Sequence, residues 1–154
     1  MTEPLRIAVL GAGRIGKMHA ELVARRVPGA RLTMVQDVHE PSAAAVAADL
    51  GVPFTTSSDA VMAASDVDAV AICSSTDTHV PLMIAAAEAG KAIFCEKPIS
   101  MELGLVDRAL AAVERARVPL QIGFNRRFDA AHKRSEEHTY ELQSRQYLVC
   151  RLLL

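Results

Sequence analysis

A glycine-rich turn between an apolar strand and a helix limits, more than any other feature, what this chain can fold into. The apolar run Leu5–Leu10 leads directly into Gly11-Ala12-Gly13-Arg14-Ile15-Gly16. A second apolar run follows one helix-length segment later and ends at Asp37, about 20 residues after the last glycine. Strand, G-x-G-x-x-G turn, helix, strand and terminal carboxylate in this order predict a dinucleotide-binding unit of the Rossmann type.

Each glycine of the turn has an expected role. We expect Gly11 to allow the tight turn out of the strand, and Gly13 to let bare backbone approach a pyrophosphate. Gly16 would let the helix pack closely on the sheet. The pyrophosphate would accept hydrogen bonds from free N–H groups at the helix N-terminus, those of Arg14 and Ile15 among them. The alternative is a glycine-rich turn without a ligand.

The residue type at position 37 indicates which dinucleotide is bound. We expect the Asp37 carboxylate to accept hydrogen bonds from the adenosine ribose hydroxyls and to repel the 2′-phosphate of NADP. No lysine or arginine follows it, since the next residues are Val38, His39 and Glu40. The sequence therefore favours NAD over NADP.

Composition agrees with a globular protein and excludes some partners. The 154 residues suit one domain, 51% of them are hydrophobic, and the formal net charge is −1. At this net charge we expect no nucleic-acid partner. We expect no membrane partner either, since no stretch approaches the roughly 18 apolar residues of a membrane helix. The first residues lack the regions of a signal peptide, so a cytoplasmic location is expected. Cys73, Cys95 and Cys150 match no metal spacing, and the first two are interpreted as buried small hydrophobes.

Short β-rich runs alternate with segments of helical period, which predicts an α/β fold, a doubly wound parallel sheet with crossover helices. The expected strands are residues 5–10, 31–36, 68–73, 92–95 and 119–123, with a weak one at 53–55.

Helix ends are indicated by proline and glycine. Pro41 and Gly51 would bracket one helix, and Thr78, Pro81 and Gly90 another, each proline lying in the first turn. A third helix is expected within 100–116, with Ser100 as its N-cap. Its apolar face would cover the sheet and consist of Leu103, Val106, Leu110 and Val113.

In open α/β sheets ligands gather at the carboxyl ends of the strands. After the third long strand comes the segment Ser74-Ser75-Thr76-Asp77-Thr78-His79, whose hydroxyls and loop N–H groups could line the cofactor. Ordinary helix capping by its serines and threonines is the alternative. After the next strand comes Glu96-Lys97-Pro98. A lysine where an apolar strand opens into the cofactor crevice is expected either to form an ion pair or to take part in the chemistry. A structural ion pair with Glu96 is the alternative to a functional role.

The order of these motifs resembles the Gfo/Idh/MocA oxidoreductases, named after glucose-fructose oxidoreductase, inositol dehydrogenase and rhizopine catabolism. The resemblance covers residues 5 to about 133 and is strongest at Glu96-Lys97-Pro98 and at Gly123-Phe124-Asn125-Arg126-Arg127-Phe128-Asp129. Within the family, the segment from Phe94 to Ser100 together with the paired arginines looks most like inositol 2-dehydrogenases.

The resemblance implies roles for particular residues. Lys97 would be the catalytic residue and would also bind substrate, because in the family this lysine lies between nicotinamide and the reacting hydroxyl. Glu96 would orient Lys97, and both Glu96 and His79 would be among the residues that bind the cofactor. Arg126 would reach the substrate hydroxyls, with a surface salt bridge as its alternative. His19 would pack beside the turn, and no metal is expected.

Two classes of function follow. The first is an NAD-dependent oxidoreductase that transfers hydride from a polyol or sugar hydroxyl to NAD, of the inositol 2-dehydrogenase type. The second is a non-catalytic NAD-binding module or redox sensor. The lysine of Glu96-Lys97-Pro98 favours the enzyme, because a sensor has no need of a cation at the hydride site.

The C-terminal residues depart from the family. We expect residues 1–123 to be the NAD-binding domain and 124–133 to begin the connection to a second α/β domain, which in the family supplies an Asp and a His and commonly makes a homo-oligomer. Residues 134–154 instead resemble an in-frame translation of a sequencing-library adapter, with Tyr140 where serine is expected. The expectation is a truncated, inactive cofactor half with its second domain absent; a divergent natural helix is the alternative.

Overall fold

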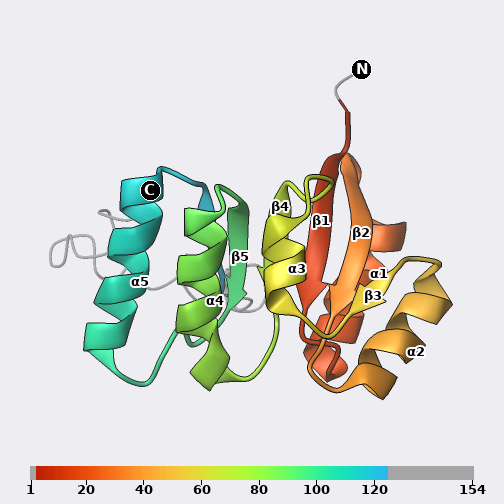
Figure 1. Cartoon of the computed structure of the whole chain (residues 1–154), viewed down its shortest axis with the longest axis horizontal. Coiled ribbons are helices and arrows are strands. Elements are labelled where there is room, and N and C mark those ends of the chain that lie inside the picture. Colours follow the sequence, from red (N-terminus) through yellow and green to blue (C-terminus); the bar gives the residue numbers. More distant parts are fainter. Residues whose placement is uncertain (1–2, 125–154) are drawn as a thin grey trace, which may run out of the picture. The chain divides into compact units, whose positions relative to one another are not determined.

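The computed structural model of the chain describes residues 3–124. In this part of the chain six parallel strands form one sheet in the order β3-β2-β1-β4-β5-β6 (Figure 1). The strands are β1 (Leu5–Leu10), β2 (Ala30–Gln36), β3 (Phe54–Thr55), β4 (Ala69–Ile72), β5 (Ala92–Glu96) and β6 (Leu120–Gly123). Every strand expected from the sequence is confirmed to within one residue. The strand order reverses between β1 and β4, which creates a crevice at their carboxyl ends.

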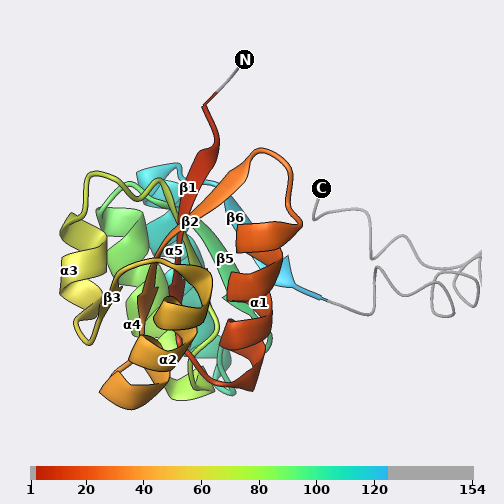
Figure 2. The same cartoon turned by 90° about the vertical axis from the view of Figure 1, so that its right-hand side faces the viewer.

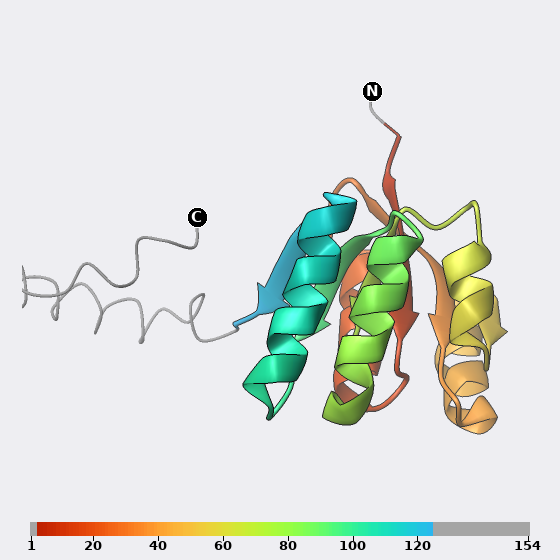
Figure 3. The same cartoon turned by 60° about the vertical axis from the view of Figure 1, so that its left-hand side comes forward.

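Helices cover both faces of the sheet, as the predicted doubly wound fold requires. On one face lie α1 (Arg14–Arg25) and α2 (Glu40–Leu50), which Figure 2 shows beside each other. On the other face lie α3 (Ser58–Ala63), α4 (Thr76–Glu88) and α5 (Leu103–Ala116), which Figure 3 shows in front of the strands. None of the helices among the described residues is long and apolar enough to cross a membrane.

The core has two layers because successive side chains of a strand point to opposite faces. In β1, Leu10 packs with Ile72 and Met83 toward α4, while its neighbour Val9 packs with Val35 toward α1 and α2. All five side chains are fully buried. The central strands therefore carry continuous apolar runs, as expected for a parallel sheet covered on both faces.

The interpretation of two cysteines as buried hydrophobes is confirmed. Cys73, directly after β4, and Cys95, in β5, are buried and form no disulfide. Desolvation, with a smaller contribution from the nearby Glu96 carboxylate, which disfavours a second negative charge, raises the pKa of each thiol to about 12.

The predicted helix ends are confirmed for α2 and for the C-terminal end of α4, where Gly90 has φ of 70°, but the predicted start of α4 is wrong. Gly51 caps α2 in the left-handed conformation, with φ of 68°. Helix α4 begins at Thr76, with Ser75 as N-cap, so Pro81 lies inside the helix rather than in its first turn. The N–H that proline lacks would have bonded the carbonyl of Asp77. Because Asp77 is exposed, water can bond that carbonyl instead.

The prediction for α5 is wrong in its start and partly wrong in its buried face. The N-cap is Glu102, and Ser100 instead accepts a hydrogen bond from the Glu102 N–H at 3.1 Å, in the turn before the helix. Leu103 and Leu110 are 82% and 41% exposed, whereas Ala109 and Ala112 are buried. Helix α5 packs against α4. In the core cluster that also contains α4 residues, α5 contributes Ala109, Val113 and the partly buried Leu105.

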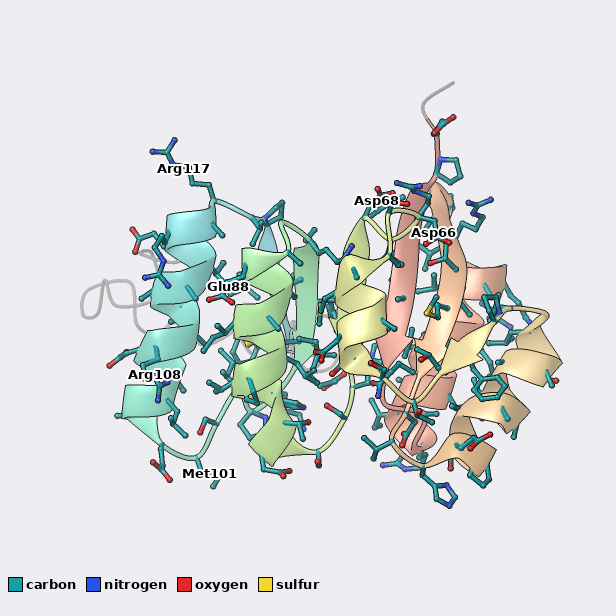
Figure 4. The ribbon with its side chains drawn as sticks, viewed as in Figure 1. Asp66, Asp68, Glu88, Met101, Arg108 and Arg117 are labelled. Carbon is teal, nitrogen blue, oxygen red and sulfur yellow. The ribbon has the colours of Figure 1, made fainter. Side chains whose placement is uncertain are left out.

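Charged groups gather at the amino ends of the strands. The Arg6 guanidinium donates to both carboxylate oxygens of Asp68, at 2.6 and 2.9 Å, which lowers the pKa of that carboxyl well below its usual range. Lys91 is buried and its ammonium donates to the carbonyls of Ala64 and Val67, at 2.8 and 2.9 Å. Figure 4 labels Asp68 at this edge and Met101 at the opposite one. This edge therefore stabilises the fold and lies away from the strand ends where ligands are expected.

Candidate functional site

A cavity of about 740 Å³ lies at the carboxyl ends of β1, β2 and β4, where the strand order reverses. It is lined by the glycine-rich turn, the end of β2, the start of α3 and the first turns of α4: Gly11, Gly13, Arg14, Ile15, Gln36, Asp37, Val38, Ser58, Asp59, Cys73, Ser74, Ser75, Thr78, Pro81, Leu82 and Ala85. The cavity thus brings together most residues that the sequence assigned to cofactor binding.

Two of the glycines shape the turn itself. Gly11 has φ of 97°, and a Cβ there would stand 2.6 Å from the Ser74 nitrogen, so no other residue fits. A Cβ on Gly16 would overlap the carbonyl oxygen of Gly11. The expected reason for Gly16 was the spacing between helix and sheet; the structure places the limiting contact within the turn.

The third glycine leaves space on the cavity side. No heavy atom lies within 4 Å of the position that a Cβ of Gly13 would take, and Gly13 lines the cavity. It is also the N-cap of α1, with no side-chain cap and no acidic residue in the first turn. The first N–H groups of α1, next to Arg14 and Ile15, therefore have no acceptor within the helix and can bind an anion.

Asp37 is held in place by two backbone N–H groups. Its Oδ2 accepts from Ala12 in the glycine-rich turn at 2.6 Å, and its Oδ1 accepts from His39 at 2.8 Å. Sequence reasoning missed both bonds. They orient the carboxylate at the cavity wall, and each oxygen keeps a further lone pair for a ribose hydroxyl.

The segment after β4 contributes three hydroxyls. Ser74 Oγ and Thr78 Oγ1 lie 2.6 Å apart, and Thr78 Oγ1 donates to the Ser75 carbonyl at 2.7 Å. Ser74, Ser75 and Thr78 line the cavity. Thr78 belongs to the segment whose hydroxyls were expected to line the cofactor. Thr76 lines a different cavity, of about 630 Å³, between the starts of α4 and α5.

Helix α3 also reaches the main cavity, which the sequence did not suggest. Ser58 and Asp59 line it because β3 pairs with β2 and so brings the following helix beside Asp37. Gln36 lines it too, and the buried Gln36 amide donates to the Thr56 carbonyl at 3.1 Å. Only the strand pairing reveals these residues.

The Glu96-Lys97-Pro98 segment follows β5. Glu96 Oε1 lies 2.9 Å from His19 Nε2, and the His19 ring packs on Phe94 with centroids 5.1 Å apart. Glu96 Oε2 accepts from the Lys97 backbone N–H at 3.3 Å. The Lys97 side chain is exposed and forms no ion pair with any carboxylate of residues 3–124.

Two other predicted residues are placed differently. His79 is 2% exposed, and its ring nitrogens lie 2.8 Å from the Pro98 carbonyl oxygen and 3.1 Å from that of Ser74. Arg126 lies outside the described residues. Within residues 3–124 no cluster of His, Cys, Asp or Glu side chains is suited to a metal ion.

The fold and the turn define a dinucleotide-binding Rossmann domain. Comparison with known proteins agrees: residues 5–124 match the Gfo/Idh/MocA oxidoreductase family, NAD-binding Rossmann fold. Inositol 2-dehydrogenase of Rhizobium meliloti is 48% identical over 125 residues, which are 81% of this chain and 37% of that protein. Myo-inositol 2-dehydrogenase of Thermotoga maritima is 42% identical over 134 residues, 86% of this chain and 40% of that protein.

A solved structure gives the same result. Scyllo-inositol dehydrogenase from Lactobacillus casei, with bound NAD(H) and scyllo-inositol, has a TM-score of 0.85 and 28% identity over 90% of this chain and 42% of that one. The chain belongs to the Gfo/Idh/MocA oxidoreductase family, and NAD is its cofactor. It spans about two-fifths of the length of these relatives.

The residues present fit that cofactor. The open side of Gly13 and the free N–H groups of α1 suit the pyrophosphate, and Asp37 suits the adenosine ribose. Val38, Leu82 and Ala85 add apolar side chains to the cavity lining, which suit contact with an aromatic base.

Proposed function

We propose that the chain is the cofactor-binding part of a cytoplasmic NAD-dependent dehydrogenase that oxidises a hydroxyl of a polyol or sugar, of the inositol 2-dehydrogenase type. The observation that carries the proposal is Lys97. An exposed ammonium with no carboxylate partner among the described residues stands at the carboxyl end of β5, on the strand next to β4 and its cavity-lining loop. The structural alternative, an ion pair with Glu96, would place the two charged groups in contact, whereas Glu96 contacts His19 at 2.9 Å.

NAD supplies the hydride acceptor when it is bound. Lys97 would hydrogen-bond the reacting hydroxyl and stabilise its alkoxide character while the carbon loses hydride. Glu96 would fix the Lys97 backbone through the 3.3 Å bond, and His19 would in turn fix Glu96. Arg126 is proposed to bind substrate hydroxyls. The hydroxyl proton would pass to groups of a second domain, as the family resemblance implies.

The test compares the chain alone with a chimera in which the second domain of the Rhizobium meliloti relative follows residue 127. We expect the 154-residue chain to bind NAD in calorimetry without forming NADH from myo-inositol, because substrate positioning and proton transfer need the second domain. The chimera should produce NADH, followed by its absorbance.

Lys97→Ala in the chimera should lower turnover by roughly 100-fold, the scale of a positioned acid–base group, with little change in NAD affinity. Lys17→Ala is the matched control, since Lys17 is an exposed lysine of α1 that contacts Glu21 at 3.9 Å. Full turnover without the Lys97 amine would refute its catalytic role. NAD binding without turnover in any chimera would instead favour the non-catalytic module.

A further inference from the structure

His79 joins the two segments that carry the candidate site. It is the fourth residue of α4 and one of the largest fully buried side chains of the described chain. Nδ1 lies 2.8 Å from the carbonyl oxygen of Pro98, and Nε2 lies 3.1 Å from that of Ser74. One ring therefore spans the loop after β4 and the segment after β5.

The chemistry of these contacts explains why a polar ring occupies a core position. Its neighbours on the buried face of α4, Val80 and Met83, are apolar. A buried imidazole is unfavourable unless hydrogen bonds replace its contacts with water. Carbonyl oxygens only accept, so the ring bonds them through an N–H donor, at Nδ1 toward Pro98 or at Nε2 toward Ser74.

The two carbonyls lie close to functional groups in the chain. Ser74 lines the cavity, and its hydroxyl contacts Thr78. Pro98 directly follows Lys97, so a bond to the Pro98 carbonyl fixes the backbone one residue from the exposed ammonium. His79 itself does not line the main cavity, because both ring nitrogens face the protein backbone.

We propose that His79 is a positioning residue that holds the Lys97–Pro98 segment against the Ser74 loop, and thereby sets where the nicotinamide half of NAD meets Lys97. This replaces the sequence expectation of direct cofactor contact with an indirect role. The inference rests on the proposed function, because that function places nicotinamide beside Lys97. The adenosine half lies at Asp37 and the glycine-rich turn, which His79 does not contact.

The test separates the two halves of the cofactor by comparing NAD with ADP-ribose, which lacks only nicotinamide. Both are titrated into the 154-residue chain by calorimetry. His79→Leu keeps an apolar side chain in the core but removes both ring nitrogens. We expect His79→Leu to lower the ratio of NAD affinity to ADP-ribose affinity by roughly tenfold, the scale of one or two hydrogen bonds. The affinity for ADP-ribose itself should stay within about threefold of that of the unmodified chain.

Conservative and matched variants complete the experiment. His79→Asn retains a donor on the side of Pro98 and His79→Gln retains one on the side of Ser74, so each should restore part of the NAD preference. Val80→Ala removes buried apolar volume from the adjacent residue of α4 and should destabilise the fold without changing that preference.

The outcomes distinguish the inference from the function on which it rests. An unchanged NAD preference in His79→Leu overturns the inference, as does an equal loss in Val80→Ala. If His79→Leu does not fold, the Asn and Gln variants decide, and an unchanged preference in both overturns it. Equal binding of NAD and ADP-ribose by the unmodified chain also overturns it. Binding of neither nucleotide contradicts the proposed function itself.

Discussion

Two glycines of the same turn should respond in opposite ways to the same added methyl group. Gly13 has φ of −68° and ψ of −174°, which any residue adopts, and no atom lies within 4 Å of its Cβ position. Gly13→Ala should therefore leave stability unchanged or raise it by up to about 1 kcal/mol, because alanine restricts the unfolded chain. The methyl group would stand in the cavity where bare backbone must approach the pyrophosphate.

We expect Gly13→Ala to weaken NAD binding. Displacing the pyrophosphate from one N–H group of α1 removes a hydrogen bond to a charged group, about 1.5–3 kcal/mol, or roughly 10- to 150-fold in Kd. Gly16→Ala is the matched variant for folding. Its Cβ would overlap the Gly11 carbonyl oxygen, a backbone atom that moves only with the whole turn. Overpacking of this kind should lower stability by about 1–3 kcal/mol.

The assay measures both quantities for both variants. Urea unfolding is followed by circular dichroism, since the chain has no tryptophan, and NAD affinity by calorimetry. The reasoning is refuted if Gly13→Ala unfolds at lower urea than the unmodified chain, or if it binds NAD with unchanged affinity. It is equally refuted if Gly16→Ala has normal stability.

Further expectations concern single side chains. Asp37→Ala should weaken NAD binding by about 1–3 kcal/mol in calorimetry, and a preference for NADP in the unmodified chain would contradict the assignment. In a Cys150→Ser variant, Cys73 and Cys95 should not react with a thiol reagent at pH 8 until the chain unfolds. The reason is that burial raises the pKa of both thiols to about 12. Asp68→Asn should lower the urea midpoint at pH 7, because the ion pair with Arg6 lowers the pKa of Asp68 in the folded chain and so stabilises the fold. The difference from the unmodified chain should shrink as the pH falls below about 4, where protonation of Asp68 removes the ion pair. An equal deficit at acid pH would contradict the pairing.

Strand positions and the cofactor turn were predictable because their signals are local. A buried parallel strand is a continuous apolar run, and the G-x-G-x-x-G turn combines residues within a few positions of one another. The role of Gly11 was predicted for the same reason, since its φ of 97° is a local backbone property. The burial of Cys95 followed from the apolar run around it.

Helix boundaries and faces were less predictable because competing residues share the same local pattern. Ser100 and Glu102 both precede α5, and the structure uses Glu102 as N-cap. Leu103 and Leu110 have the spacing of an apolar face, yet they are exposed while Ala109 and Ala112 of α5 are buried. The spacing of apolar residues does not say which side of α5 faces the sheet and α4, because that orientation is set by tertiary packing.

The sequence by itself determined a parallel α/β sheet, an NAD-binding turn and an acidic residue for the ribose, since each depends on residues close in the chain. Only the tertiary structure decided which distant groups meet. It placed Asp59 beside the cavity, paired Glu96 with His19 rather than with the Lys97 ammonium, and set His79 between two backbone carbonyls. Strand order and helix packing bring these groups together, and such contacts leave no periodic signal in the sequence.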